Sequence, residues 1–117
     1  MNLVEIDMGN LGRLLKGDFD TLWAQGFDAL VAPTSPSVAF PFGARMDDPV
    51  AMYLSDACTL PVNMAGLPGI SIPCGLSEGL PVGLQLIGPQ LSENLVFRAA
   101  HALEGAIGFD FVPERLR

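Results

Sequence analysis

Basic residues are scarce in this chain: six Lys and Arg stand against thirteen Asp and Glu, and the formal net charge is -7. The six are scattered along the sequence rather than gathered on one expected face. Because phosphate neutralisation normally dominates affinity for nucleic acids, the chain is expected not to bind nucleic acid directly. If an RNA takes part in the function, another subunit is expected to hold it.

Cysteine, histidine and long apolar runs are scarce as well. Cys58 and Cys74 lie too far apart for a CxxC motif and have no His or acidic neighbours at metal-ligand spacing, so two reduced, packed thiols and no metal site are expected. Pro or Gly interrupts each apolar run before it reaches the about 20 residues of a membrane-spanning helix. The first ten residues carry no basic residue of the kind that opens a secretory signal. These features predict a cytoplasmic chain.

Patterns for catalysis and nucleotide binding are also missing. Neither GxxxxGK[ST] nor GxGxxG follows an expected strand, so no cofactor is predicted. No serine lies in GxSxG, and Ser71 is expected within a strand rather than at a strand-to-helix elbow. The single His, His101, falls in the last expected helix, where a structural role is favoured over that of a general base. No catalytic residue is therefore assigned.

Hydrophobic residues, in contrast, make up 50% of the 117 residues, and only 16% are charged. Soluble domains usually carry about one-quarter charged residues, so this chain is expected to expose more apolar surface than usual. Either a partner or further chain could cover that surface. The length itself fits one small domain.

Three helices are predicted from apolar periodicity and end signals. Apolar residues from 11 to 23 recur at helical spacing, with Asn10 as the expected N-cap and Gly26 at the end. Asp48 before Pro49 predicts a second helix running to Cys58, which would display Tyr53 and Asp56 close to one side. A third helix is expected between Ser92 and Gly108.

Short strands are predicted at 28–32, near 70–73 and at 82–87, and the Pro-rich stretch 33–43 is predicted to be a loop. The residues 77–81 favour a turn that joins the last two strands as an antiparallel pair. All three strands are mostly apolar and are expected to be covered on both faces. The order of elements predicts an α/β layer structure with a mixed sheet of at least three strands and flanking helices.

Asp56 is the one candidate binding residue. It lies in a segment with few other charges near the end of a short expected helix, where the helix dipole disfavours a carboxylate. One interpretation is an exposed Asp or a cap for the following turn. The other is that Asp56 faces a pocket and binds the ammonium group of a ligand.

Three stretches, residues 39–45, 48–56 and 63–88, read AFPFGAR, DPVAMYLSD and NMAGLPGISIPCGLSEGLPVGLQLIG. Nearly letter for letter, they resemble the C-terminal third of the A subunits of tRNA-dependent amidotransferases, which belong to the amidase-signature family. The similarity runs from Arg13 to Gly105. Other amidase-signature hydrolases share the GLP and GLQ elements but usually lack the YxxD helix beside them. The resemblance implies a partial amidase-signature fold.

In that family the A subunit hydrolyses glutamine with a Lys, a bridging Ser and a nucleophilic Ser. The ammonia passes to a partner subunit that amidates Glu-tRNA(Gln) or Asp-tRNA(Asn). The resemblance thus implies glutamine as substrate and the B and C subunits as partners. It also implies that Asp56 occupies the position that binds the α-ammonium of glutamine. An acid at this position favours glutaminase over a general amidase, because simple amides lack that cation.

The catalytic Ser, Ser and Lys of the family, and the Arg that holds the substrate carboxylate, have no counterpart in residues 1–117 and are expected upstream. The chain is thus interpreted as a single C-terminal fragment of an amidase domain, inactive alone, whose residues 1–10 do not match the family. Two alternatives stay open. The chain could derive from a general amidase-signature hydrolase, or it could be an interaction module that pairs with itself or another subunit through a sheet edge.

Overall fold

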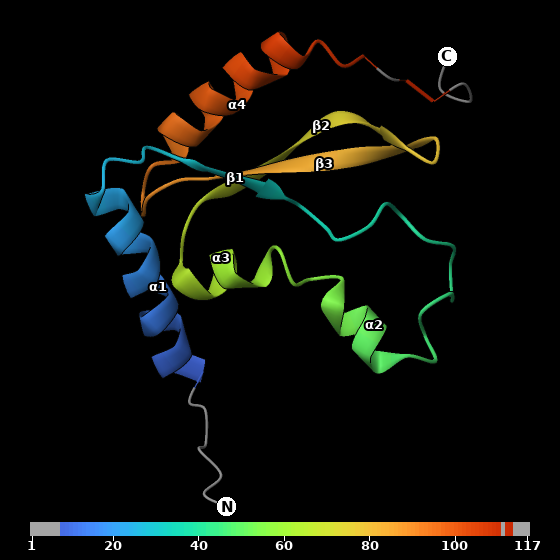
Figure 1. The fold of residues 1–117 in the computed structure, drawn as a ribbon, viewed down its shortest axis with the longest axis horizontal. Helices are drawn as coiled ribbons and strands as arrows, with labels where there is room; N and C mark the ends of the chain where they lie inside the picture. The colour runs from blue at the N-terminus through green and yellow to red at the C-terminus, as the bar shows by residue number, and fades with distance from the viewer. Residues whose placement is uncertain (1–7, 111, 114–117) are drawn as a thin grey trace, which may run out of the picture.

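The computed structural model describes residues 8–110 and 112–113. Part of the segment expected not to match the family, residues 1–7, lies outside these described residues. The elements in chain order are α1 (Met8–Ala24), β1 (Leu30–Pro33), α2 (Pro49–Leu54), α3 (Leu60–Ala65), β2 (Gly69–Ser77), β3 (Leu80–Ile87) and α4 (Glu93–Ile107) (Figure 1). This is the predicted order, with one additional short helix, α3.

The three strands form one sheet in the order β1-β3-β2. Among the described residues both pairings are antiparallel, so the prediction of a mixed sheet is wrong in this respect. The predicted hairpin of β2 and β3 is confirmed. Its loop is only Glu78 and Gly79, which both have positive φ, at 54° and 77°. Two-residue hairpin loops commonly have this backbone because it matches the twist of the flanking strands.

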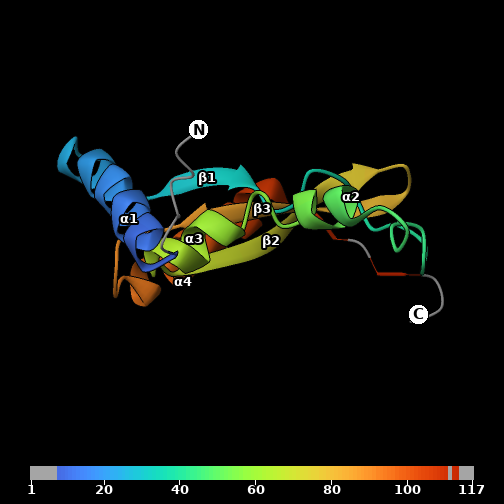
Figure 2. The ribbon, with the colours of Figure 1, turned by 90° about the horizontal axis from the view of Figure 1, so that it is seen from below.

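Helices cover both faces of the sheet. Figure 1 shows α4 on one side and α1 with α3 on the other, and Figure 2 shows α1, α3 and α2 in front of the sheet. On the α4 side the core consists of Ile72, Leu86 and Ala100. The core on the other side contains Ile87 of β3 and three residues from α3 and the segment after it, Val62, Ala65 and Leu67. Leu86 and Ile87 are neighbours in sequence, and they pack in the cores on opposite faces of the sheet because side chains alternate along a strand.

The helix α1 spans Met8–Ala24, so Asn10 lies inside the helix rather than at its N-cap as predicted. Leu15, Phe19 and Trp23 pack on the core beside α3, as the apolar spacing indicates. Leu14, in contrast, is 68% exposed. A second feature of α1 was not visible in the sequence. A Cβ at Gly12 would lie 2.7 Å from the carbonyl oxygen of Met64, so the glycine that weakens the helix also lets α3 approach it closely.

The second predicted helix is shorter than expected. Asp48 caps α2 as predicted, and its side chain accepts hydrogen bonds from the backbone N–H groups of Val50 and Ala51. The helix ends at Leu54 instead of Cys58, and α3 follows after a turn. Pro61 therefore does not stop a helix. It lies in the first turn of α3, where its missing N–H leaves no hydrogen bond unmade.

The last helix agrees with its predicted bounds, and Gly108 ends it in the left-handed conformation. Its predicted N-cap differs in detail. The Ser92 hydroxyl does not cap the helix but donates to the carbonyl oxygen of Pro89, at 2.5 Å. The Ser92 hydroxyl therefore stabilises the tight turn before α4 rather than the first turn of the helix.

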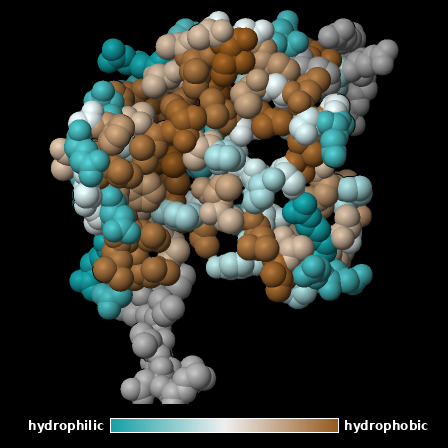
Figure 3. Space-filling view, in the orientation of Figure 1, coloured by the Kyte–Doolittle hydropathy of each residue, from teal (hydrophilic) through white to brown (hydrophobic). Residues whose placement is uncertain are grey.

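The core is small for a chain of this length. The described residues include eight buried hydrophobic side chains, and none of their large side chains is less than 2% exposed. Val31 of β1 is 60% exposed, so β1 is not covered on both faces as predicted. Hydrophobic surface is visible beside α4, over the sheet and around α2 (Figure 3). The expected surplus of apolar surface is therefore confirmed. None of the described helices combines the length and apolar character needed to span a membrane.

Candidate functional site

Asp56 lies in the turn between α2 and α3, with an exposed side chain. Its backbone carbonyl accepts hydrogen bonds from the N–H groups of Thr59, at 3.1 Å, and Leu60, at 2.9 Å. The carboxylate makes no hydrogen bond or ion pair with the residues that the structure describes. The main chain of Asp56 thus shapes the turn, while its negative charge stays available to an external cation.

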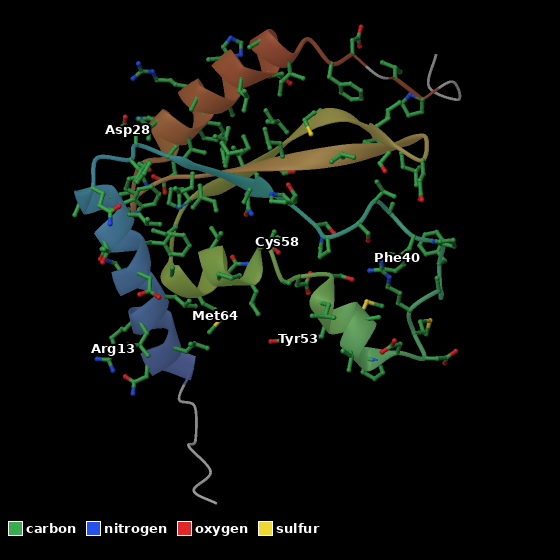
Figure 4. The ribbon with its side chains drawn as sticks, viewed as in Figure 1. Arg13, Asp28, Phe40, Tyr53, Cys58 and Met64 are labelled. Atoms are coloured by element: carbon green, nitrogen blue, oxygen red, sulfur yellow. The ribbon has the colours of Figure 1, made fainter. Side chains whose placement is uncertain are left out.

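A hollow of ≈ 500 Å³ lies beside Asp56, which is one of its lining residues. Its lining comes from α2, from the loop before it and from the turn after it: Arg45, Met46, Pro49, Met52, Tyr53 and Asp56. Figure 4 labels Tyr53 on α2 and Phe40 on the preceding loop. Tyr53 and Asp56 share the hollow, which confirms that they lie close to one side. The hollow thus combines apolar walls with the Asp56 carboxylate and the Arg45 guanidinium, and the carboxylate suits the ammonium group of a small ligand.

Arg45 is a member of the site to which the sequence analysis gave no role. Its guanidinium donates from Nη1 to Ser55 Oγ and from Nη2 to Ser37 Oγ, each at 2.8 Å. It also stacks over the ring of Phe40, with 4.1 Å between Cζ and the ring centroid. In the sequence, Arg45 is part of the AFPFGAR stretch that carries the family resemblance, and this was the available signal.

Gln85 fixes the other end of the turn that carries Asp56. It is the buried polar residue of the sheet, only 5% exposed. Its Nε2 donates to the carbonyl oxygens of Cys58, at 3.0 Å, and Pro33, at 3.4 Å. A buried amide is stable only when such partners satisfy it. Its signal in the sequence was a lone polar side chain in an otherwise apolar strand.

A second hollow, of ≈ 350 Å³, lies between the sheet and α3. Thr34 and Ser71 both line it, and their hydroxyl oxygens are 2.6 Å apart. Ser71 lies within β2, as predicted, and its hydroxyl pairs with this Thr rather than with a basic side chain. His101 is exposed on α4, on the opposite side of the sheet from α3 (Figure 1). The structure therefore brings neither residue to Asp56.

Among the described residues, the thiols and the acidic side chains do not gather into a metal centre. Cys58 and Cys74 are both free and partly buried. The Cys74 thiol donates to the carbonyl oxygen of Val82, at 3.5 Å. Within residues 8–110 and 112–113, no three His, Cys, Asp or Glu side chains are close enough together to hold a metal ion.

Residues 8–97 match the family described as Amidase. The chain belongs to this family. It is 53% identical over 103 residues to the A subunit of the glutamyl-tRNA(Gln) amidotransferase of Caldanaerobacter subterraneus subsp. tengcongensis, a match that covers 88% of the chain and 21% of the relative. The amidase match thus spans about a fifth of the length of such relatives.

Two solved amidase structures have similar folds. The crystal structure of the glutamyl-tRNA(Gln) amidotransferase A subunit from Thermotoga maritima aligns with a TM-score of 0.77 and 43% identity, over 82% of this chain and 21% of that one. The structure of 6-aminohexanoate cyclic dimer hydrolase aligns with the same TM-score, 0.77, at 27% identity, over 91% of this chain and 25% of that one. The antiparallel sheet with its covering helices is therefore part of an amidase-signature fold.

Proposed function

We propose that this chain is the C-terminal part of the glutamine-hydrolysing amidase subunit of a tRNA-dependent amidotransferase. In the whole subunit, Asp56 binds the α-ammonium of glutamine, and the released ammonia serves the conversion of Glu-tRNA(Gln) to Gln-tRNA(Gln). The similarity to amidotransferase A subunits, at 53% identity in sequence and 43% in a solved structure, supports this assignment over that of a general amidase.

The observation that carries the proposal is the Asp56 carboxylate at the hollow beside α2, which has no partner among the described residues. Arg45 lines the same hollow but forms no ion pair with this carboxylate, and its guanidinium contacts two serine hydroxyls and an aromatic ring instead. A ligand ammonium would pair with the carboxylate directly. Glutamine brings such a group beside its amide, whereas simple amides do not.

The proposal places the catalytic Ser, Ser and Lys in the part of the subunit that this chain does not span. It also assigns the B and C subunits as the partners of the whole protein. The isolated chain is accordingly expected to release no ammonia from glutamine above the rate in buffer. Ammonia release by the purified chain would show a nucleophile within residues 1–117 and overturn this part of the proposal.

The test of Asp56 needs a complete subunit. The test uses the amidotransferase A subunit of Caldanaerobacter, with its matching segment replaced by this chain. This hybrid protein is called the joined subunit. Asp56→Asn is expected to raise the KM for glutamine about tenfold to a hundredfold, because a hydrogen bond to a charged group contributes about 1.5–3 kcal/mol. Hydrolysis of butyramide, which has no ammonium group, is expected to stay unchanged. Asp47→Asn removes the same charge from an exposed residue outside the hollow and serves as the matched control.

Two results would contradict this role. An unchanged KM for glutamine in Asp56→Asn would show that the carboxylate does not bind the substrate. An equal loss for glutamine and butyramide would show that Asp56 supports the structure of the site rather than recognising the ammonium.

A second candidate is a general amidase, favoured by the equal TM-score of 6-aminohexanoate cyclic dimer hydrolase. The two candidates differ in substrate preference. If this chain comes from a general amidase, the joined subunit should hydrolyse butyramide and glutamine with similar kcat/KM. If it comes from a glutaminase, the joined subunit should prefer glutamine and should lose that preference with Asp56→Asn.

The third alternative, an interaction module that pairs with itself or another subunit through a sheet edge, has less support. Pro33 ends the edge strand β1, and Pro73 adjoins a break in the register of β2 on the other edge. Proline and bulges are features that hinder pairing at an edge, because they remove or misdirect ladder hydrogen bonds. Size measurement in solution separates the cases: a monomer is expected, and a stable dimer would favour the interaction module.

A further inference from the structure

We propose that Arg45 is a positioning residue, which holds the turn that carries Asp56 in the orientation that ligand binding requires. This inference rests on the proposed function of Asp56 as the ammonium-binding residue. It assigns to Arg45 a role in the affinity for the amino-acid substrate, through the placement of a neighbouring side chain.

The helix α2 needs such an anchor because it has no buried residue. Its cap by Asp48 is local and fixes only its own first turn. Two of its exposed side chains, Val50 at 67% and Tyr53 at 68%, add nothing to either core. Hydrophobic packing within the described residues therefore does not determine where α2 and the following turn lie.

Arg45 supplies the anchor at the start of that turn. Ser55, the residue before Asp56, accepts a hydrogen bond from Arg45 and donates one to the carbonyl oxygen of Ala51, at 3.1 Å. Ser37 accepts from the second nitrogen of the same guanidinium, at 2.8 Å. The planar guanidinium can make both bonds at fixed angles, whereas an ammonium group is a point charge without this geometry. The loop and the end of α2 are thus joined through one side chain.

Gln85 anchors the far end of the turn. Its bond to the carbonyl oxygen of Cys58 ties this end to the central strand β3. Asp56 therefore lies between two anchored residues, Ser55 and Cys58, although its own side chain has no partner among the described residues. The two anchors fix the turn beside the hollow that Asp56 lines. With the Arg45 anchor removed, the α2 end of the turn loses its link to the loop.

The first experiment follows backbone hydrogen exchange in the chain as it exists. Arg45→Ala is expected to speed exchange of the amides of residues 55–60 about tenfold. The reason is that one hydrogen bond contributes about 1 kcal/mol to stability, which is close to the free energy of a tenfold change in an equilibrium constant. The exchange rates of these amides in Arg45→Lys are expected to lie between those of the unchanged chain and those of Arg45→Ala. Arg13→Ala, which removes an exposed α1 side chain whose one hydrogen-bond partner among the described residues is Asn10, is the control and should leave these amides unchanged. Unaltered exchange in Arg45→Ala would overturn the positioning role.

The second experiment measures glutamine kinetics in the joined subunit. Arg45→Ala is expected to raise KM about fivefold to tenfold and to change kcat less, because the loss falls on binding. Arg45→Lys should recover part of this loss. Ser55→Ala should also raise KM, and the double variant should be no worse than Arg45→Ala, since both substitutions break the same link.

The outcomes separate this inference from the function on which it rests. If Arg45→Ala raises KM while Ser37→Ala and Ser55→Ala do not, Arg45 contacts the ligand directly and the positioning role is overturned. An unchanged KM in Asp56→Asn overturns the proposed function itself. The exchange experiment reports on the anchor in either case, because it involves no substrate.

Discussion

The two halves of the molecule are held together differently. The sheet with α1, α3 and α4 has two hydrophobic clusters, one on each face. The other half, residues 34–59, contains α2 and its flanking loop and turn, and it has no residue in the buried class. The bonds of Arg45 to Ser37 and Ser55 join the loop to α2 within this half, and the bond from Gln85 to Cys58 ties the half to β3. The candidate binding residue, Asp56, lies in the half without a core.

This difference separates stability from function within one short chain. A core substitution should lower the stability of the whole molecule, because the clusters are shared among several elements. A substitution around α2 should act locally and change ligand binding instead. Binding residues often lie on loops that a rigid scaffold positions, and here the scaffold reaches the loop through only a few hydrogen bonds.

The largest expected effect comes from the core on the α4 side. Leu86 is 4% exposed and packs in the cluster with Ile72 and Ala100. Leu86→Ala should lower the free energy of unfolding by about 2–5 kcal/mol, measured by urea unfolding. Val50→Ala on α2 is the control and should change it by less than about 0.5 kcal/mol. If Leu86→Ala fails to fold, Leu86→Val removes less of the side chain and serves as the milder substitution. Equal losses at both sites would remove the distinction between the halves.

A smaller loss is expected where β3 passes closest to its neighbours. A Cβ at Gly83 would lie 2.6 Å from Ser71 Oγ and 2.9 Å from Thr34 Oγ1. Gly83→Ala should therefore cost about 1–3 kcal/mol by overpacking. Gly75→Ala meets no atom within 4 Å and is the matched control on the partner strand. Thermal unfolding measures both variants, and a Gly83 variant as stable as the Gly75 variant would refute the close approach.

Gln85→Leu tests the link between the halves. The substitution removes both hydrogen bonds from the amide and leaves the carbonyl oxygens of Cys58 and Pro33 without that donor, at a cost of about 1–2 kcal/mol. Hydrogen exchange should accelerate in residues 55–60 more than in β2. Gln90→Leu, at an exposed position, is the control. A uniform acceleration would mean that Gln85 stabilises the core rather than the turn.

The smallest effect is expected at the cap of α2. Asp48→Ala should destabilise this helix by about 1 kcal/mol, because the first N–H groups of α2 lose their acceptor. Since α2 buries no residue, the midpoint of thermal unfolding should stay unchanged while the amides of residues 50–54 exchange faster. Asp47→Ala is the control. A lowered midpoint would show that α2 is coupled to the core after all.

Local patterns predicted most of the sheet half. The apolar strands and the Glu78-Gly79 turn lie next to each other in sequence, so their pairing needs no distant information. Helix α4 was predicted from its spacing and from Gly108. The missed break between α2 and α3 has a local cause too, because Pro61 fits the start of a helix as well as its stop.

The site was predicted only in part. The isolated charge of Asp56 and the Tyr53 spacing indicated a candidate pocket, and the structure brings both to one hollow. Arg45 was missed because its hydroxyl partners, Ser37 and Ser55, lie 8 and 10 positions away in irregular segments, where no periodicity marks them. Gln85 was missed because its partners are backbone carbonyls of distant residues. Gln85 reaches Cys58, 27 positions earlier, and such a pair leaves no periodic signal.

The sequence by itself determined the secondary-structure order, the apolar surplus and the position of the one candidate binding residue, because spacing, caps and charge act over a few neighbouring residues. Only the tertiary structure decided that the sheet is antiparallel throughout its described strands and that Gly12 admits α3. It also decided that Asp56 lies between two anchored residues, with no partner for its carboxylate among the described residues, because that arrangement depends on contacts that form only on folding.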